Sequence, residues 1–561
     1  MIALGKIGHC AYDEQMAACV RNQSESSDLR RKLRSSPLLW LLAAQILSGC
    51  RVGVPKRHNP SSTASPQVLS LSSASAFQVS ATPATSSCAN ESLRGSHHTY
   101  DIGPGRKYTE VSEVPWLSLT AGDVVNIYYR AEPYRTKLGL RAQGTRENPV
   151  VINGVTNEKC ERPMLTGEDS VPSRDAAEGK YFSEKYTEFL GTIIIYRGPG
   201  DPWGYKPKHI QIKNLKITGA SKGAPYTAQS GAKARFGQGA GGIYAVVVED
   251  LLVENCEITG NGNGVFVNTR NDSEEEASRR VTLRRNILHL NGTPGSYYEH
   301  NAYVQAERAL YEGNYIGQLV DGALGSSLKD RSSGTIVRFN HIDAAARAID
   351  LVETEGGATT VFRDPNYHSA WVYGNLIISD WGSRERTSSE LLIHWGGDNS
   401  PQFFRRGTLF FYYNTVVTHG ERREHWRINV FDMPTNDQHV EARSNVFYHS
   451  GDTNLQLLVS AGSLTFLGTN WISKGWQRCR EDAKVTINFQ GKMMEGASPG
   501  FRAPEDRDFT LTADAAIVDA GDREAPTNLL GHWVDFEYQP IARLIPRTRQ
   551  GQAYDLGAFE R

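Results

Sequence analysis

Val246-Val-Val-Glu-Asp-Leu-Leu-Val-Glu-Asn255-Cys-Glu-Ile258 contains the pattern that decides the fold: a short apolar strand, an asparagine at a bend, and a second short strand. In most copies the asparagine is followed by one free position and then by a β-branched or aromatic residue. Successive copies are 25 to 41 residues apart, with irregular additions above that lower limit, which is typical of a coil with fixed rungs and variable loops. The nine copies begin at Asn214, Asn255, Asn286, Asn314, Asn340, Asn375, Asn414, Asn445 and Asn470.

Strand, bend, strand and loop together make one rung of a parallel β-solenoid. An asparagine at the same bend of each rung can hydrogen-bond the backbone of that bend and the amide stacked on it. The repeated asparagines are therefore interpreted as architectural. They indicate no activity by themselves.

Composition and length agree with a large β protein. The chain has 561 residues, 53 Gly, 24 Pro and only 6 Met, and a solenoid can use that length as a single body. Lys and Arg number 61 against 62 Asp and Glu, which leaves a formal net charge of -1. This balance gives no indication of a nucleic-acid partner or of binding to an anionic membrane surface.

The N-terminal residues 1–50 carry a processing signal. The basic stretch Arg30-Arg-Lys-Leu-Arg34 precedes an apolar stretch from Pro37 to Leu47 that is too short to span a bilayer and fits the core of a signal peptide. Leu47-Ser-Gly-Cys50 resembles the lipobox of bacterial lipoproteins. That resemblance implies an exported protein anchored to a membrane only by lipid on Cys50, at the outer membrane, in the periplasm or on the cell surface. An ordinary signal peptide that ends near a cysteine is the alternative, and Met16 is a candidate true start.

Residues 51–97 are rich in Ser, Thr, Ala and Pro, so they cannot bury a core and are predicted to form a flexible tether. An exported location permits disulfides, but the sequence does not give their pairing. The cysteines beyond Cys50 are Cys88, Cys160, Cys256 and Cys479.

Both ends of the remaining chain resemble one superfamily. Leu117-Ser-Leu-Thr-Ala-Gly-Asp-Val-Val125 and Gly144-Thr-Arg-Glu-Asn-Pro-Val-Val-Ile-Asn-Gly154 resemble the first rungs of the pectate-lyase-like right-handed parallel β-helix proteins. Asp508-Phe-Thr-Leu-Thr512, Ala516-Ile-Val-Asp-Ala-Gly521 and Asp555-Leu-Gly-Ala-Phe-Glu560 resemble their closing segments. The resemblance implies an all-β, right-handed parallel β-helix with N- and C-terminal caps. It leaves the reaction open, because this superfamily contains lyases, hydrolases, epimerases and binding proteins.

The expected organisation has three parts after the tether. Residues 98–205 would form the N-terminal cap and first rungs, 206–489 the core of the helix, and 490–561 the C-terminal closing segment. We expect a monomer.

Alignment of the rungs by their asparagines predicts one chemically mixed face. Residues at matching positions of neighbouring rungs lie about 4.8 Å apart and form a column. Acids, a lysine, an arginine and histidines would share a few rungs with the aromatic residues Tyr303 and Trp395. The predicted face carries His300, Tyr303, Lys329, Arg331, Asp350, Glu353, His394 and Asp432.

This mixture suits an acidic polysaccharide as substrate. In β-elimination on a uronate, a positive charge neutralises the sugar carboxylate and a base removes the proton at C5. Lys329 is the candidate base, because like charge from a neighbouring arginine lowers the pKa of a lysine. Arg331 or Arg347 would neutralise the carboxylate, and His300 or Tyr303 would protonate the leaving oxygen.

The order of lysine and arginine over adjacent rungs is similar to that of the alginate and chondroitin-B lyases of the superfamily. Those enzymes have Arg-His-Gly at the arginine, whereas Arg347 is followed by Ala348 and Ile349. The roles of Lys329 and Arg347 are therefore implied only loosely by the resemblance.

Two further sets of residues complete the predicted site. Asp350, Glu353 and Glu355 could hold a calcium ion, a hard cation that prefers several oxygen ligands. Calcium is the one cofactor that the sequence suggests. Three other side chains are candidates for binding the acidic polysaccharide, namely His394, Trp395 and Arg427.

Three alternatives stay open at this point. An inverting glycoside hydrolase would pair Asp350 with Glu353 or Asp398, because it needs carboxyl groups about 6.5–9.5 Å apart. A non-catalytic β-helix would bind glycans through Tyr303, Trp395 and Trp426 without cutting them. A purely structural interpretation makes Lys329 to Arg331 a charged turn that pairs with acids on the next rung.

Overall fold

The computed structural model describes residue 88 and residues 91–270, 273–355, 359–380, 391–420, 427–459, 461–479, 483, 485–529 and 531–561. The predicted signal peptide, the lipid anchor at Cys50, almost all of the tether and Trp426 lie outside these residues and stay predictions. Within the described part, no helix is long and apolar enough to cross a membrane.

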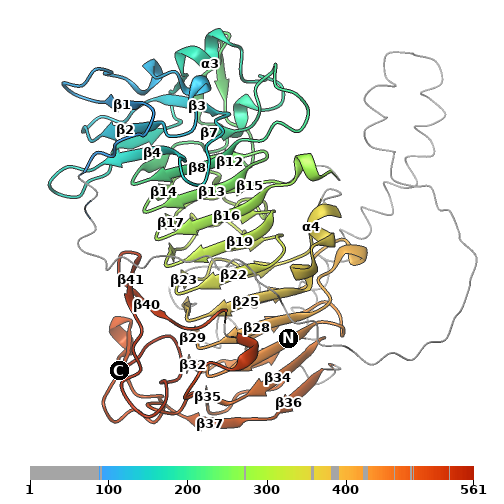
Figure 1. Cartoon of the computed structure of the whole chain (residues 1–561). Coiled ribbons are helices and arrows are strands. Elements are labelled where there is room, and N and C mark those ends of the chain that lie inside the picture. Colours follow the sequence, from blue (N-terminus) through green and yellow to red (C-terminus); the bar gives the residue numbers. More distant parts are fainter. Residues whose placement is uncertain are drawn as a thin grey trace, which may run out of the picture. The chain divides into compact units, whose positions relative to one another are not determined.

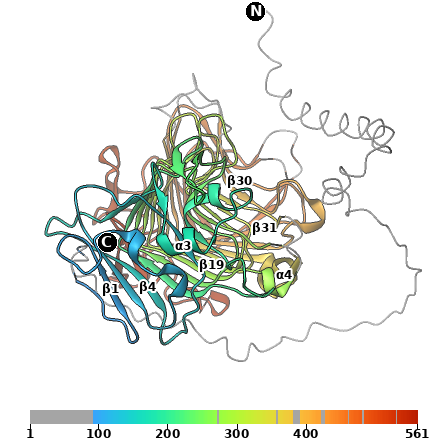
Figure 2. The ribbon, with the colours of Figure 1, turned by 90° about the horizontal axis from the view of Figure 1, so that it is seen from above.

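The described chain winds through three long sheets whose neighbouring strands are all parallel, which confirms the predicted β-solenoid. Figure 1 shows the rungs stacked in sequence order from β1 to β37, and Figure 2 looks along the stack. The chain passes from sheet 1 to sheet 2, then to sheet 3 and back to sheet 1. One such turn is β13, β14, β15 and β16.

Sheet 1 has 13 strands: β1 (Thr99–Ile102), β2 (Val124–Tyr128), β4 (Val150–Val155), β8 (Lys208–Lys213), β13 (Glu249–Glu254), β16 (Arg279–Arg284), β19 (Glu307–Glu312), β22 (Thr335–Arg338), β25 (Ser369–Tyr373), β28 (Thr408–Tyr412), β31 (His439–Arg443), β34 (Ser463–Leu467) and β36 (Thr486–Phe489).

Sheet 2 has 11 strands: β5 (Met164–Thr166), β9 (Lys216–Thr218), β14 (Glu257–Thr259), β17 (Ile287–His289), β20 (Tyr315–Ile316), β23 (His341–Asp343), β26 (Leu376–Asp380), β29 (Thr415–Gly420), β32 (Val446–Gly451), β35 (Thr469–Ser473) and β37 (Lys492–Gly496).

Sheet 3 also has 11 strands: β3 (Thr136–Leu140), β6 (Val171–Pro172), β7 (Gly191–Ile195), β12 (Gly241–Ala245), β15 (Asn263–Val267), β18 (Ala302–Val304), β21 (Leu328–Asp330), β24 (Ile349–Leu351), β27 (Leu391–Trp395), β30 (Arg427–Asp432) and β33 (Asn454–Leu458).

The other elements are short. Three antiparallel hairpins are β10 (Pro225–Thr227) with β11 (Lys233–Arg235), β38 (Phe501–Ala503) with β39 (Asp508–Leu511), and β40 (Phe536–Gln539) with β41 (Arg543–Pro546). The α-helices are α3 (Arg174–Glu178) and α4 (Thr359–Arg363). The 3-10 helices are Val111–Glu113, Trp116–Ser118, Glu188–Leu190, Glu274–Glu276, Pro365–His368, Pro401–Phe403, Pro504–Asp506 and Thr527–Leu529.

The core lies inside the coil because strand residues alternate in direction. Leu251 and Val253 of β13 and Val265 and Val267 of β15 are almost completely buried against one another and against Ile258 of β14. The same alternation directs the intervening residues outward, where charged side chains can be tolerated. The rungs therefore supply rigid columns of outward side chains.

The repeated asparagines lie at the corner between sheets 1 and 2, as predicted, but they form two ladders rather than one. From Asn286 to Asn470 each side-chain amide donates to the next Oδ1 at 2.9–3.2 Å. Asn255 instead donates to Asn214 at 2.7 Å, because these two residues themselves adopt positive φ, whereas in the next rung the residue before Asn286 does. Relative to the residue with positive φ, the ladder asparagine thus moves one position towards the C-terminus between Asn255 and Asn286.

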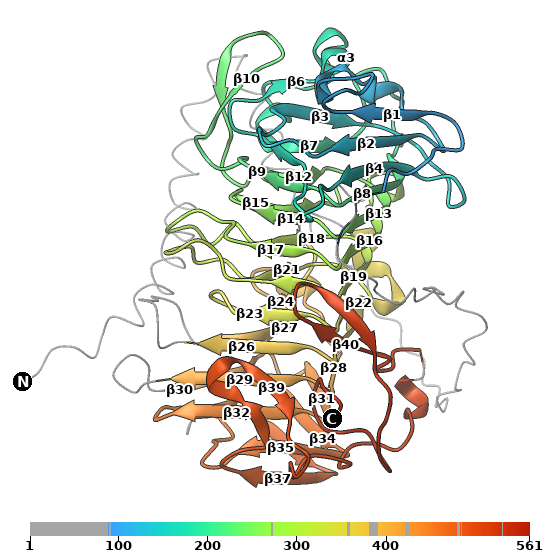
Figure 3. The ribbon, with the colours of Figure 1, turned by 90° about the vertical axis from the view of Figure 1, so that its left-hand side faces the viewer.

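The N-terminal end of the coil is held by a disulfide between Cys88 and Cys160, a pairing that the sequence left open. At the other end, the closing segment returns along the side of the coil. Phe501 and Phe509 pack on the outer face of sheet 2, and Phe536 of β40 contacts Phe339. Figure 3 shows β40 beside the middle rungs. This arrangement leaves the outer face of sheet 3 to the connecting loops.

Candidate active site

The predicted charged column exists on the outer face of sheet 3. Tyr303, Lys329, Asp350, His394 and Asp432 occupy matching positions of five consecutive strands, from β18 to β30. The residues next to them on each strand point into the core; Leu328, beside Lys329, is completely buried. The asparagine register was therefore sufficient to align these five positions.

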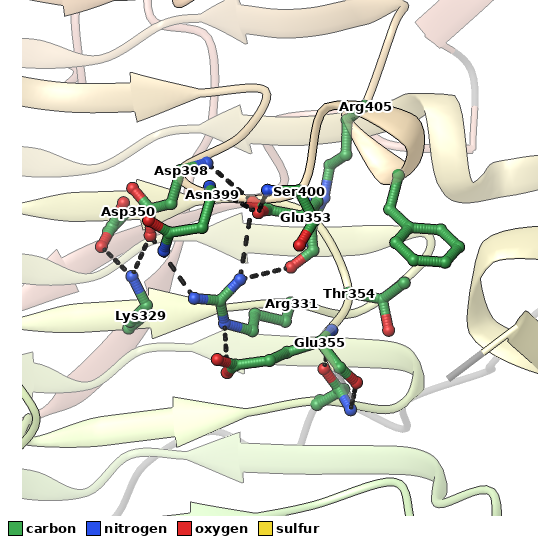
Figure 4. Close-up of polar contacts among 12 residues, drawn as sticks. Lys329, Arg331, Asp350, Glu353, Thr354, Glu355, Asp398, Asn399, Ser400 and Arg405 are labelled. Atoms are coloured by element: carbon green, nitrogen blue, oxygen red, sulfur yellow. Dashed lines mark hydrogen bonds and ion pairs between the residues drawn. The ribbon is translucent and has the colours of Figure 1, made fainter. Parts of the chain in front are cut away.

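Lys329 lies at the centre of the cluster and is 8% exposed. Its Nζ donates to Oδ2 of Asp350 at 2.7 Å and to Oδ2 of Asp398 at 2.7 Å (Figure 4). Asp350 belongs to β24, whereas Asp398 belongs to the loop after β27. One lysine thus joins a rigid strand to a connecting loop.

Asp350 is the most heavily contacted acid of the cluster. Its carboxylate accepts from Oγ of Ser326 at 3.1 Å and lies 2.9 Å from Nδ1 of His394. Burial alone would raise the pKa of the Asp350 carboxyl, but Lys329, His394 and Arg347 outweigh it and hold that pKa well below its usual value. Asp350 is therefore a carboxylate near neutral pH.

Asp398 is also held as a carboxylate. Burial and the neighbouring Asp350 act to raise the pKa of its carboxyl, and Lys329 and His394 lower it by more, so the net shift is downward. Neither acid beside Lys329 carries a proton that it could give to a leaving group.

Glu353 places Asp398 by binding the backbone of its loop. The Glu353 carboxylate accepts the backbone N–H groups of Asp398, Asn399 and Ser400 at 2.7, 2.8 and 2.8 Å (Figure 4). Arg331 donates from Nη1 to the Glu353 carbonyl oxygen at 2.6 Å. Both oxygens of Glu353 are thus used to fix a loop.

The same loop is fixed at its other end by an ion pair that the sequence analysis missed. Arg405 and Asp330 are completely buried and lie 3.1 Å apart, and Asp330 also accepts from Oη of Tyr311 at 2.9 Å. Arg405 N–H donates to the carbonyl oxygen of Gly396, where the loop begins. A charged residue at an inward strand position, such as Asp330, was the available signal.

Arg331 and Arg347 lie on opposite sides of Lys329 and differ in accessibility. Arg331 is 4% exposed, and its Nε donates to Oη of Tyr303 at 2.8 Å. Arg347 precedes β24 and has a 26% exposed side chain that lies 3.4 Å from Asp432 and 3.8 Å from Asp350. Arg347 is therefore the guanidinium that remains accessible to a solute.

His300 and Tyr303 flank the cluster on its N-terminal side. The backbone N–H of Ser326 donates to Nδ1 of His300 at 2.9 Å, so the ring proton lies on Nε2. Burial, and then the charge of Lys329, lower the pKa of His300 to about 3, so the ring is neutral and cannot donate a proton as an imidazolium. Burial raises the pKa of Tyr303 and keeps its hydroxyl protonated.

The three predicted polysaccharide-binding residues lie in different environments. Trp395 is completely buried and faces the core, where it packs with Arg405, so a sugar cannot reach it and the prediction is corrected. His394 belongs to the cluster and is 4% exposed. Arg427 begins β30, five residues before Asp432, which is about 16 Å along an extended strand.

The predicted calcium ligands do not converge. Both oxygens of Glu353 bind backbone N–H groups, and the exposed Glu355 accepts from Oη of Tyr303 at 2.7 Å. The ligand atoms that do lie together, within 4.8 Å of one another, belong to Asp350, His394 and Asp398. Nζ of Lys329 already lies between the two carboxylates, and a histidine is a poor calcium ligand.

Comparisons with known proteins concern the fold. Residues 181–342 match a family model described as right handed beta helix region, which agrees with the predicted hand. The solved structure of pectate lyase Pel9A is similar, with 10% identity, a TM-score of 0.38, and coverage of 79% of this chain and 89% of that chain. A search of curated proteins gives no match.

Two structures of GH136 lacto-N-biosidase from Eubacterium ramulus also resemble this chain. The native protein is 12% identical with a TM-score of 0.32, and the selenomethionine derivative is 12% identical with a TM-score of 0.30. Each alignment covers 71% of this chain and 68% of the other.

Proposed function

We propose that the cluster around Lys329 is the active site of an enzyme that cleaves a uronate-containing polysaccharide by β-elimination. The observation that carries this proposal is the position of Lys329: its Nζ lies on the outer face of sheet 3, between two anionic carboxylates. An enzyme that eliminates across C4 and C5 of a uronate needs positive charge for the sugar carboxylate and a base at C5.

The residues divide into fixed and exchangeable contacts. Asp350 on β24 orients Nζ of Lys329, whereas the side chain of Asp398, on a loop whose backbone is fixed, can rotate away from Nζ when a substrate carboxylate takes its place. Arg347, with its partly exposed side chain, would bind the same sugar carboxylate. The substrate carboxylate would thus take the position that the Asp398 carboxylate holds beside Nζ of Lys329.

The reaction then needs only one base and one proton donor. Lys329 acts here as the neutral amine: its Nζ takes the C5 proton and becomes an ammonium, the electron pair forms the C4–C5 double bond, and the bond from C4 to the linking oxygen breaks. The hydroxyl of Tyr303, which is kept protonated and accepts from Arg331, is the candidate donor to the leaving oxygen. Calcium has no role in this scheme and is tested as an addition to the assay.

Hydrolysis is less well supported. An inverting pair needs carboxyl groups about 6.5–9.5 Å apart, one of them protonated. Asp350 and Asp398 each place an oxygen within 4.8 Å of the other and both have lowered pKa values. Glu353, the other predicted partner, is bound to backbone N–H groups.

The experiment is an assay of the purified chain on a panel of polyuronates, with and without calcium. Ultraviolet absorbance detects the double bond of the unsaturated product, and a reducing-end assay detects any cleavage. We expect both signals to rise together on at least one substrate. Reducing ends without absorbance would indicate hydrolysis, and binding without either signal would indicate a glycan-binding protein.

A further inference from the structure

A second cluster of ligand-type side chains lies at the N-terminal end of the coil, away from sheet 3. His97 and His98 precede β1, and Asp123 precedes β2 of the next rung. Nδ1 of His97 lies 2.8 Å from Oδ1 of Asp123, and Nδ1 of His98 lies 3.3 Å from the same oxygen. The three ligand atoms lie within 4.8 Å of one another.

The carboxylate of Asp123 is held in place by the backbone. Its Oδ2 accepts the N–H of Thr120 at 2.9 Å, and its Oδ1 accepts the N–H of His98 at 3.0 Å. Asp123 is 1% exposed, whereas the side chains of His97 and His98 are 48% and 59% exposed. A fixed buried acid thus faces two imidazoles that solvent can reach, and backbone contacts of this kind orient metal ligands.

The arrangement brings two imidazole nitrogens to one carboxylate oxygen. Oδ1 of Asp123 is approached by three nitrogen atoms, namely the two Nδ1 atoms and the backbone nitrogen of His98. The N–H of His98 and Nδ1 of His97 hydrogen-bond this oxygen, and Nδ1 of His98 adds a third nitrogen at 3.3 Å. A cation beside the oxygen could be bound by the lone pairs of both ring nitrogens and by the carboxylate.

The distances also fit a metal. Zinc binds histidine nitrogen and carboxylate oxygen at about 2.1 Å, so two ligands that subtend roughly 85–105° at the ion lie about 2.8–3.3 Å apart. The separations of 2.8 and 3.3 Å fall in this range. Imidazole with carboxylate is a donor set for divalent first-row transition metals rather than for calcium.

The two candidate clusters differ in what already lies between their ligand atoms. Between Asp350 and Asp398, Nζ of Lys329 already occupies the central position. In the described part of the chain, the ion pairs of Asp123 are those with His97 and His98. A metal ion therefore has less to displace at the N-terminal cluster.

We propose that His97, His98 and Asp123 bind one divalent transition-metal ion, with Zn²⁺ as the representative, and that the remaining coordination positions are filled by water. The ion would fasten the segment before β1 to the next rung. A ligand that binds only the folded state raises the melting temperature, so the stabilisation by zinc would rise with the free zinc concentration.

The experiment titrates Zn²⁺ alone into the chelator-treated full chain by calorimetry and follows the melting temperature. We expect one zinc per chain, at least about tenfold weaker binding in His97→Ala and in His98→Ala, and loss of the zinc-dependent rise in melting temperature in both. The matched control is His394→Ala, which removes a ligand from the other cluster and should leave zinc binding unchanged.

The exposed side chains of His97 and His98 make misfolding of these variants a minor concern, and circular dichroism without zinc checks it. Unchanged zinc binding in both variants would overturn the proposal, because it would place the ion elsewhere. Loss of binding in His394→Ala, or no binding by the unmodified chain, would overturn it as well.

Discussion

In the described part of the coil, a charged column on sheet 1 and the charged column on sheet 3 are built differently. On sheet 1 the column alternates in sign, with each acid between basic neighbours, and its members come from the strands themselves. Its members are Lys213, Glu254, Arg284, Glu312 and Arg338. On sheet 3 the column of Lys329 also recruits Asp398 and Arg347 from connecting loops, and the side chains of these two residues are 18% and 26% exposed.

The difference separates architecture from a candidate site. Alternating partners on a sheet cancel one another with no help from the loops, so the column on sheet 1 needs no further explanation. Around Lys329 a loop is fixed at one end by Glu353 and at the other by a fully buried ion pair, in order to bring one more acid to a lysine. Desolvating so many charges is costly, and such clusters occur preferentially at functional sites.

The largest expected effect on stability is that of Arg405→Leu. This variant leaves the buried Asp330 without its counter-charge, and we expect the free energy of unfolding to fall by about 4 kcal/mol. Chemical denaturation measures it. The matched control is Arg406→Leu, because Arg406 is adjacent and half-exposed and should change stability by less than about 1 kcal/mol. Equal effects of the two variants would mean that the buried pair does not fix the loop.

The asparagine ladder provides a second comparison, between a buried asparagine of the ladder and an exposed asparagine outside it. Asn340 accepts from the backbone and side chain of Asn314 and donates to Asn375 and to Tyr311. Asn340→Ala leaves several of these buried groups unpaired, so we expect a loss of about 3 kcal/mol. Asn488→Ala, at an exposed position of the last rung, should be nearly neutral in the same denaturation experiment.

The free energy of unfolding, measured over a range of pH, tests whether His300 is buried as a neutral imidazole. Its pKa is lowered to about 3 in the folded chain, against about 6.5 in the unfolded chain, so the unfolded chain binds more protons between these values. Stability that is present above about pH 6.5 is therefore lost as the pH falls towards about 3. In His300→Gln this loss between pH 6.5 and 4.5 should be smaller by about 2 kcal/mol. If the unmodified chain and His300→Gln lost stability equally as the pH falls, His300 would not be a buried neutral imidazole.

The smallest effect is expected on sheet 1. Arg284→Gln removes one member of the alternating column, but Glu254 keeps Arg285 and Glu312 keeps Arg338 as partners. We expect the free energy of unfolding to change by less than about 1 kcal/mol and enzymatic activity to be unchanged. A loss as large as that of Arg405→Leu would remove the distinction between the two columns.

The sequence was sufficient for the features that repeat and insufficient for those that do not. The asparagines fixed the register, and the register placed Lys329, Asp350, His394 and Asp432 in one column. It also placed Trp395 on the outside, although an aromatic residue next to an outward histidine on a strand must face inward. Strict alternation would have corrected this.

The contributions of the loops could not be predicted in the same way. Asp398 meets Lys329 across 69 residues, and Arg405 meets Asp330 across 75. No periodicity specifies where a loop returns to the coil. For the same reason the predicted calcium ligands do not converge: Glu353 and Glu355 follow β24 in sequence, but their side chains bind the loop backbone and Tyr303.

The most direct test of the central claim compares two lysine variants in the absorbance assay, on the polyuronate that gives the fastest unmodified reaction. Lys329→Ala removes the proposed base, and Lys216→Ala removes a half-buried, ion-paired lysine from sheet 2. The account predicts that Lys329→Ala, assayed well below its own melting temperature, lowers the rate of double-bond formation at least about 100-fold, while Lys216→Ala stays near the unmodified rate. The melting temperature of Lys329→Ala should also fall, because Asp350 and Asp398 lose the charge between them. Comparable rates for the two variants would show that Lys329 is not the base.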